Sequence, residues 1–182
     1  MSKLMTETQV RIDNVRASYE HLIKPSAFPG AEPKYSVCAL VSKDDKESLE
    51  ILKKAIANAE KKGVEKFGQK YAKAQRRNPL MDGDVEKEGQ PGYENHIYFN
   101  ASNKIKPRVL DATTGLEAEE SDIYSGMYGK LIVNFYPYYS TAASCGVTAS
   151  LRGFQKTDDG DVLGGARVTD ADFSDEAGGF LD

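Results

Sequence analysis

The sequence predicts a mostly β fold interrupted by one helical region. Residues 10–18 and 34–41 are rich in strand-forming residues, and a loop with three prolines separates them. Similar segments follow in the second half of the chain, whereas only one segment has a sustained helical period. The later strand candidates are residues 93–102, 105–111, 127–139 and 144–156.

The helical segment begins after Ser42, where the pair Asp44–Asp45 favours a helix start, and we expect it to end at Gly63. Residues 64–79 are expected to form either a second, shorter helix or an ordered excursion. Residues 61–77 contain seven bases and one acid, a charge that would either guide a polyanion or only keep a helix in water. The apolar residues at helical spacing are Leu49, Leu52, Ile56 and Ala59.

Five to six short strands with one helix inserted among them predict a small Greek-key β-barrel. The OB-fold is the leading case, and an α+β sandwich is the alternative. A chain of 182 residues is long enough for one such domain plus appendages. We expect the domain to span residues 1–166, with a helical insertion at about 42–77. Residues 167–182 are expected to be an acidic, disordered tail, because they can bury too little apolar area to offset ordering.

The net charge of −4 is divided unevenly along the chain. Residues 157–182 contain eight acids and one base, a balance of −7, which leaves +3 for residues 1–156. A basic body with an acidic end is typical of nucleic-acid binders with a regulatory tail, although solubility alone also explains acidic ends. No apolar run approaches the ~20 residues of a membrane span, and no secretory signal is visible at the N-terminus.

The residue content argues against catalysis. The two histidines and two cysteines are too scattered to form a metal site, and Cys38 and Cys145 are expected to be reduced, buried thiols. Asp82 and Asp84 belong to an Asp-Gly-Asp sequence, which is far more often a turn than a metal pair or a nuclease site. Motifs for phosphate-binding loops, serine nucleophiles and zinc proteases are missing. We therefore expect no enzyme, no cofactor and no metal.

Alternation along residues 127–139 separates two rows of side chains. One row is mainly aliphatic and fits a barrel interior: Met127, Gly129, Leu131, Val133 and Phe135. The other row mixes aromatic, basic and polar side chains: Tyr128, Lys130, Ile132, Asn134, Tyr136 and Tyr138. Pro137 indicates that the strand ends, or reaches a sheet edge, at that point.

The next strand, residues 144–156, alternates in the same way. Its second row contains Thr148, Ser150, Arg152 and Phe154. Neighbouring rows of aromatic and basic side chains suit single-stranded nucleic acid, since rings stack on bases and cations contact phosphates. The alternative is that the tyrosines cover the barrel where the helix packs. Lys104, Lys106 and Arg108 alternate along one face and would either contact phosphates or form a solvated edge strand.

Five segments, in this order, match a known family pattern over about residues 8–166: RIDNVRASYEHLIKP, PKYSVCALVSKDD, GYENHIYFNASNKIKPRVLD, YSGMYGKLIVNFYPYY and GVTASLRGFQKTDDGDVLGG. The most specific parts are YSGMYGK and the run GVTASLRGFQ followed by a DG turn and LGG. In these segments the chain resembles the phage and prophage single-stranded-DNA-binding proteins.

The resemblance implies an OB-fold that binds single-stranded DNA without strong sequence preference, for replication or recombination of phage DNA in the cytoplasm of a bacterial host. It also implies an acidic tail that recruits replication or recombination proteins or competes with DNA. This chain departs from the commonest tail, because it ends in GGFLD rather than in the aromatic residue.

Together, the face pattern and the resemblance predict a set of DNA contacts. The predicted contacts are Tyr98, Lys104, Lys106, Arg108, Tyr128, Lys130, Tyr136, Tyr138, Arg152 and Phe154. Two other functions remain open: a non-enzymatic phage structural or assembly protein whose aromatic face contacts protein, and an RNA-binding OB module. The oligomeric state is not determined by the sequence.

Overall fold

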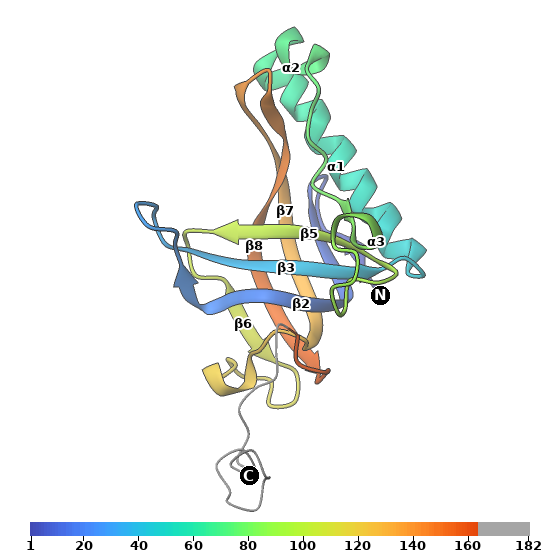
Figure 1. Cartoon of the computed structure of the whole chain (residues 1–182). Helices are drawn as coiled ribbons and strands as arrows, with labels where there is room; N and C mark the ends of the chain where they lie inside the picture. The colour runs from blue at the N-terminus through green and yellow to red at the C-terminus, as the bar shows by residue number, and fades with distance from the viewer. Residues whose placement is uncertain (164–182) are drawn as a thin grey trace, which may run out of the picture.

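A computed structural model describes residues 1–163 of the chain. Its main body is a β-barrel from which one long hairpin and one long helix extend together (Figure 1). The elements are β1 (Lys3–Leu4), β2 (Gln9–Ser26), β3 (Lys34–Ser42), α1 (Lys46–Phe67), α2 (Gln69–Lys73), β4 (Met81–Asp82), α3 (Gly83–Glu86), β5 (His96–Asn103), β6 (Arg108–Asp111), the 3₁₀ turn η1 (Glu120–Asp122), β7 (Tyr128–Thr141) and β8 (Ser144–Asp158).

Five strands close the barrel. The strand order is β4-β5-β3-β2-β7-β8-β6, and β5 also pairs with β8, which joins the two halves of the sheet into a ring. This closing contact is parallel and short, through Ala101↔Ala149 and Ser102↔Ser150, whereas the other contacts of the ring are antiparallel. The prediction of a mostly β, OB-like barrel is confirmed, and the sandwich alternative is wrong.

The barrel interior is filled by the aliphatic row predicted from the sequence. Leu131 and Val133 of β7 are fully buried, and Phe135 is 1% exposed. The ring centroid of Phe135 lies 5.7 Å from that of Phe99 on β5. Apolar side chains of α1 belong to the same core, so the helix packs on the barrel with one face: Leu52, Ala55, Ile56 and Ala59.

The ends of α1 follow local capping chemistry. The side chain of Asp45 accepts a hydrogen bond from the backbone N–H of Ser48, which satisfies one free donor of the first turn. The helix ends at Gly68, whose φ of 77° is a left-handed conformation that favours glycine. The prediction that Gly63 ends the helix is wrong. A β-carbon at Gly63 would lie 2.5 Å or less from the ring of Tyr71, so this glycine allows α2 to pack closely against α1.

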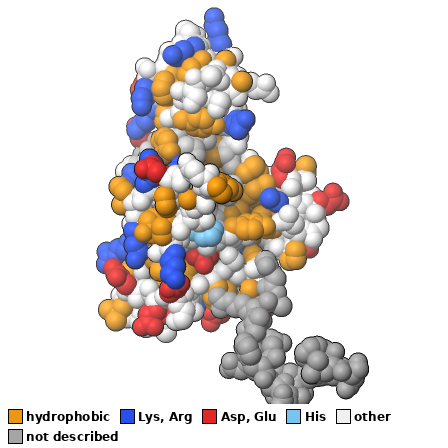
Figure 2. All heavy atoms as spheres, turned by 60° about the vertical axis from the view of Figure 1, so that its left-hand side comes forward, with side chains coloured by type: hydrophobic (Ala, Val, Ile, Leu, Met, Phe, Trp, Pro, Cys, Tyr) orange, Lys and Arg blue, Asp and Glu red, His pale blue; other side chains and the backbone are white. Residues whose placement is uncertain are grey.

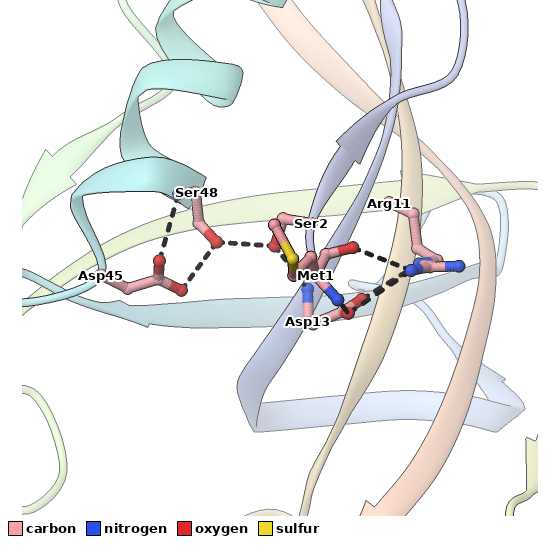
Figure 3. A network of polar contacts seen from close by, with 6 residues as sticks. All are labelled: Met1, Ser2, Arg11, Asp13, Asp45 and Ser48. Atoms are coloured by element: carbon pink, nitrogen blue, oxygen red, sulfur yellow. Dashed lines mark hydrogen bonds and ion pairs between the residues drawn. The ribbon is translucent and has the colours of Figure 1, made fainter.

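A polar network joins the N-terminus to both β2 and α1 (Figure 3). The terminal ammonium of Met1 lies 2.7 Å from a carboxylate oxygen of Asp13, and Arg11 donates hydrogen bonds to the same carboxylate and to the Met1 carbonyl. The Ser2 hydroxyl lies 2.6 Å from the hydroxyl of Ser48 in the first turn of α1. The network therefore fixes the start of the helix relative to the barrel.

Several predicted strand ends differ from the structure, since β2 continues to Ser26 rather than to residue 18 and β5 begins at His96 rather than at residue 93. β7 continues through Pro137 to Thr141, but β2 pairs with β7 only as far as Asn134. Pro137 consequently lies where one side of β7 has no strand partner, so its missing N–H removes no ladder hydrogen bond. The prediction of a sheet edge is confirmed, whereas the prediction of a strand end is wrong. The strand expected from residue 105 begins only at Arg108.

The predicted acidic tail, residues 167–182, lies outside the described residues. Both cysteines are buried and free, as predicted. No helix within residues 1–163 is both long enough and apolar enough to cross a membrane.

Candidate nucleic-acid interface

A groove crosses the outside of the barrel beside the β2–β3 loop. Its wider part has a volume of about 630 Å³ and lies between the end of β2, the start of β3 and the outer row of β5. A second hollow of about 340 Å³ continues from it across β5, β7 and β8. Both hollows are lined by Lys34 and Ser102, so we treat them as one feature and call it the barrel groove. Figure 2, in which this side comes forward, shows hydrophobic and basic side chains interspersed over the face.

Aromatic rings lie at both ends of the barrel groove. Phe28 is 86% exposed and Tyr19 is 58% exposed, and both line the wider part. Tyr136, 44% exposed, lines the second hollow. Large apolar rings at such exposure leave their faces free to stack on a flat ligand.

Sequence reasoning missed Tyr19 and Phe28. Tyr19 has a φ of +44° and lies at a register shift between β2 and β3, where the extra residue changes the direction of the side chain. Phe28 lies in the proline-rich loop between these strands. The sequence did contain a signal for Phe28: it is a large aromatic residue in a Pro- and Gly-rich loop, where no strand or helix period predicts that it is buried.

Three bases surround the second hollow: Lys34, Lys104 and Arg152. Arg152 forms no ion pair with another residue of the described chain. Lys104 pairs with Glu32 of the β2–β3 loop, and the hydrogen bond from Lys104 lowers the pKa of the Glu32 carboxyl, to which the charge of Lys34 also contributes. The carboxylate thus neutralises one of the three cations of the groove.

The outer row of β7 lies where alternation placed it. Tyr136, Asn134 and Lys130 are exposed or half-buried, opposite to the buried interior row. Tyr136 and Asn134 line the barrel groove, whereas Lys130 lines a different hollow near the N-terminus. Tyr138 is half-buried and lies farther along the hairpin.

Tyr128 is half-buried and has one face covered. The guanidinium of Arg16 lies 5.4 Å from its ring centroid and also donates a hydrogen bond to the Asp161 carbonyl at 2.7 Å. A β-carbon on Gly160 would lie 2.7 Å from the Tyr128 ring, so the segment after β8 passes close to this side chain. A base could stack on Tyr128 only if these neighbours moved.

The prediction that Phe154 lies on the exposed face is wrong. Phe154 is 2% exposed and belongs to the barrel core. The cause is a bulge: Val133 pairs with Leu151 and the adjacent Ile132 pairs with Gly153, so Arg152 is the extra residue of β8. The bulge leaves Arg152 exposed and reverses the alternation after it. The buried ring of Phe154 offers no stacking surface.

The ring of Tyr98 is also too buried in this structure to stack on a base, for a different reason. It lies on the outer side of β5 but is only 4% exposed, because it packs in a small cluster with Leu40, Tyr93 and Leu163. The Tyr93 ring meets it edge-on, with centroids 5.4 Å apart. Leu163 follows β8 in the chain, so the segment after β8 covers this end of the outer face.

Cys38 links the covered cluster to the barrel groove, since it belongs to the first and lines the second. The Tyr93 hydroxyl lies 3.6 Å from the Cys38 sulfur and 2.9 Å from the Ser18 hydroxyl. Burial raises the pKa of the Cys38 thiol, which therefore remains protonated at neutral pH.

The remaining predicted contacts lie apart from the groove lining. Lys106 and Arg108 are exposed, Lys106 before β6 and Arg108 as the first residue of β6. Arg108 pairs with Gly153, the residue next to Arg152 in β8, so these two cations lie on neighbouring strands.

The Asp82–Asp84 pair is occupied by an internal cation. The Lys43 ammonium lies 2.7 Å from Asp82 and 2.6 Å from Asp84, and its hydrogen bonds lower the pKa of both carboxyls. Asp82 also accepts a hydrogen bond from the backbone N–H of Asp84, which begins the short helix α3. Asp82 ends β4 and Gly83 and Asp84 begin α3, so the structure has a strand end and a short helix where the sequence predicted a turn. Residues 1–163 contain no cluster of three or more potential metal ligands.

Comparisons with known proteins identify the family of this chain. A family model described as "Enterobacter phage Enc34, ssDNA-binding protein" matches residues 8–180. The chain belongs to the Enc34 single-stranded-DNA-binding protein family. The resemblance read from the sequence is therefore confirmed.

Several relatives of this Enc34-family chain are similar over nearly its whole length. Putative protein p50 of Acyrthosiphon pisum secondary endosymbiont phage 1 is 33% identical over 175 residues, covering 92% of this chain and 93% of that protein. The solved single-stranded DNA-binding protein of bacteriophage Enc34 in complex with ssDNA is 26% identical, with a TM-score of 0.74 over 89% of this chain and 96% of that one. Gp2.5 of bacteriophage T7 is 16% identical with a TM-score of 0.60, covers 97% of this chain and 95% of that one, and supports the fold alone.

Proposed function

We propose that this protein binds single-stranded DNA, without strong sequence preference, in the barrel groove. The observation that supports the proposal best is the groove itself, which is lined by both exposed aromatic rings and cations. Membership of the Enc34 family supports the same ligand, since a relative was solved in complex with ssDNA.

Base stacking would come from the exposed rings of the groove. Tyr136 keeps the role predicted from the sequence, and the newly identified Tyr19 and Phe28 supply the other end. Stacking is worth about 1–3 kcal/mol per base and tolerates any sequence, because every base has a flat face. Tyr138 extends the series along the hairpin, while Phe154 and Tyr98 are not part of the surface as it stands.

Phosphate contacts would come from the exposed cations. Lys34, Lys104 and Arg152 line the groove, and Lys106 and Arg108 continue from it along β6. Neutralising phosphates releases counterions, so the logarithm of affinity should fall with the logarithm of salt by about 0.7 per contacted phosphate.

The test is a titration with oligo-dT that follows tyrosine fluorescence, since the chain has no tryptophan to obscure the signal. We expect quenching on binding, affinity that falls steeply with salt, and much weaker binding to a duplex of equal length. Equal affinity for duplex and single strands, or affinity independent of salt, would overturn the proposal. Competition by an oligo-rU of the same length tests the RNA-binding alternative.

Replication or recombination of phage DNA in the host cytoplasm is the setting that we propose for this binding. The acidic C-terminal residues would recruit partner proteins or compete with DNA for the groove, since Asp and Glu dominate the charge of residues 157–182. If they compete, deleting residues 168–182 tightens binding to oligo-dT at low salt. Unchanged affinity would argue against competition and leave recruitment as the tail's role, which a pull-down of replication proteins with the intact chain would then test.

A further inference from the structure

The β7–β8 hairpin projects beyond the barrel and has two different faces. β2 pairs with β7 only up to Asn134, and β5 pairs with β8 only at Ala149 and Ser150. Beyond these residues the hairpin runs beside α1 to its far end, next to α2 (Figure 1). One face is covered by the helices, and the opposite face is the continuation of the outer row that lines the barrel groove.

The covered face of the hairpin contacts α1 and α2 through polar and aromatic side chains. The Tyr71 hydroxyl of α2 donates a hydrogen bond to the Gly146 carbonyl at 2.8 Å. The ring of Tyr139 lies 5.9 Å from that of Phe67, with the Lys70 ammonium 4.7 Å from the Tyr139 centroid. This packing fixes the direction of the opposite face, which includes Tyr136 and Tyr138.

Two consecutive arginines lie at the far end of the hairpin: Arg76 packs on α2, whereas Arg77 pairs with β8. Arg76 lies over the Tyr71 ring at 5.2 Å and donates hydrogen bonds to the Tyr71 and Ala72 carbonyls at the end of α2. Arg77 extends the sheet, since its N–H donates to the Cys145 carbonyl and its carbonyl accepts from Val147. Neighbouring side chains of an extended segment point to opposite faces, so Arg77 lies on the outer face.

Arg77 and Tyr138 flank the same glycine. Gly146 pairs with Tyr138 on one side and with Arg77 on the other. A β-carbon at Gly146 would lie 2.4 Å from the Arg77 carbonyl oxygen, so the pairing requires glycine. Arg77 is exposed and forms no ion pair with another residue of the described chain. A hollow of about 700 Å³ opens beside it and is lined also by Gln75, Arg76, Ala142 and Ala143, so Arg76 reaches the same hollow.

This hairpin tip continues the barrel groove. Ser150 lines the groove, and Gly146 lies four residues farther along the same strand, a distance of about 13 Å. The outer row between them carries Tyr136 and Thr148, which are opposite each other on the two strands. Figure 2 shows Lys or Arg side chains at the upper end of the molecule, the end that carries α2 and the hairpin tip in Figure 1.

We propose that the hairpin tip, formed by Arg77, Tyr138 and Gln75, is a second subsite for the single strand bound in the barrel groove. Arg77 binds a phosphate and Tyr138 stacks on a base, so that the strand follows the outer row of the hairpin away from the barrel. The inference rests on the function proposed above and adds an outer subsite that a short strand does not reach.

The experiment compares Arg77→Ala with wild-type protein over a series of oligo-dT lengths from about 4 to about 20 nucleotides, a range that includes the site sizes of single OB-folds. We expect equal affinity for the shortest oligonucleotides that bind and a loss of about tenfold for the longest. The salt dependence for long oligonucleotides should decrease by about 0.7, the value of one phosphate contact. Arg77→Lys should restore most of the affinity and the salt dependence.

Lys54→Ala is the matched control, because Lys54 is exposed on α1 and lines none of the described hollows. Thermal unfolding of each variant tests whether the hairpin remains folded. Wild-type affinity of Arg77→Ala at every length, or an equal loss at every length, would overturn the subsite while the groove proposal remained. Failure of wild-type protein to bind any oligonucleotide would instead overturn the proposed function.

Discussion

The hydroxyl of Tyr71 donates a hydrogen bond to the carbonyl of Gly146, and this contact joins the helical insertion to the β7–β8 hairpin. Both residues are buried, and the Tyr71 ring packs against Gly63 of α1. The insertion therefore supports one face of the hairpin, while the other face remains open as an extension of the barrel groove.

Gly63→Ala should destabilise the protein, although alanine favours a helix over glycine by about 1 kcal/mol. The added methyl group would lie 2.3 Å from the Tyr71 ring and 2.9 Å from Pro137, and the ring cannot move without losing its hydrogen bond. Overpacking of this kind costs about 1–3 kcal/mol, so we expect a lower midpoint of thermal unfolding. Glu65→Ala, at an exposed position of the same helix, is the control and should change stability by less than about 0.5 kcal/mol. A higher midpoint for Gly63→Ala would contradict the close packing.

Tyr136→Ala and Phe135→Ala should separate binding from stability at adjacent positions. Tyr136 is 44% exposed in the barrel groove, so its loss should weaken oligo-dT binding by about tenfold, within the ~1–3 kcal/mol of one stacked base, with little change in stability. Phe135 is 1% exposed in the core, so its loss should cost about 3–5 kcal/mol of unfolding free energy. Chemical denaturation and oligo-dT titration of both variants provide the measurements. Full affinity in Tyr136→Ala would exclude its ring from the interface.

Glu32→Gln should strengthen binding of single strands. The carboxylate pairs with Lys104 at the edge of the groove and repels phosphate, so its neutralisation frees one cation. We expect severalfold tighter binding to oligo-dT at low salt, with the difference shrinking as salt screens both charges. Glu50→Gln removes the same charge from the exposed surface of α1 and should have a much smaller effect. Equal effects of the two variants would indicate that only the total charge matters.

Asp13→Asn should reduce stability in a manner that depends on pH. Burial raises the pKa of the Asp13 carboxyl, but hydrogen bonds and charges of the terminal ammonium and of Arg11 outweigh burial and lower the pKa overall. A carboxyl with a lowered pKa stabilises the fold above its unfolded pKa, and this contribution is lost as the pH falls through the folded pKa. The stability difference between wild-type protein and variant should thus be constant near pH 7 and shrink in acid. Denaturation at several pH values measures it, and a difference independent of pH would contradict the ion pairs (Figure 3).

Local sequence patterns were sufficient to predict which side chains are buried in regular strands and helices. Period-two alternation placed Leu131, Val133 and Phe135 in the core and Tyr136 on the outside, because every residue of a regular strand faces opposite to its neighbours. Helical spacing likewise identified the face of α1 that packs on the barrel. The order of five segments identified the family, and the family model confirmed it.

The predictions from sequence were wrong where a single residue interrupts the alternation of a strand, or where a segment distant in the sequence buries a side chain. The bulge at Arg152 moved Phe154 into the core, and Leu163 covers the cluster that contains Tyr98. Gly63 lies inside its helix rather than at the end. Its missing side chain leaves space for the ring of Tyr71, a neighbour that only tertiary packing brings there.

The sequence by itself therefore determined the barrel, the helical insertion and the chemical character of the surface, since these follow from side-chain type and spacing. The tertiary structure alone decided which rings and cations share a groove. Tyr19, Phe28, Lys34, Lys104, Tyr136 and Arg152 come from six different segments, and only closure of the barrel through β5 and β8 places them along one surface.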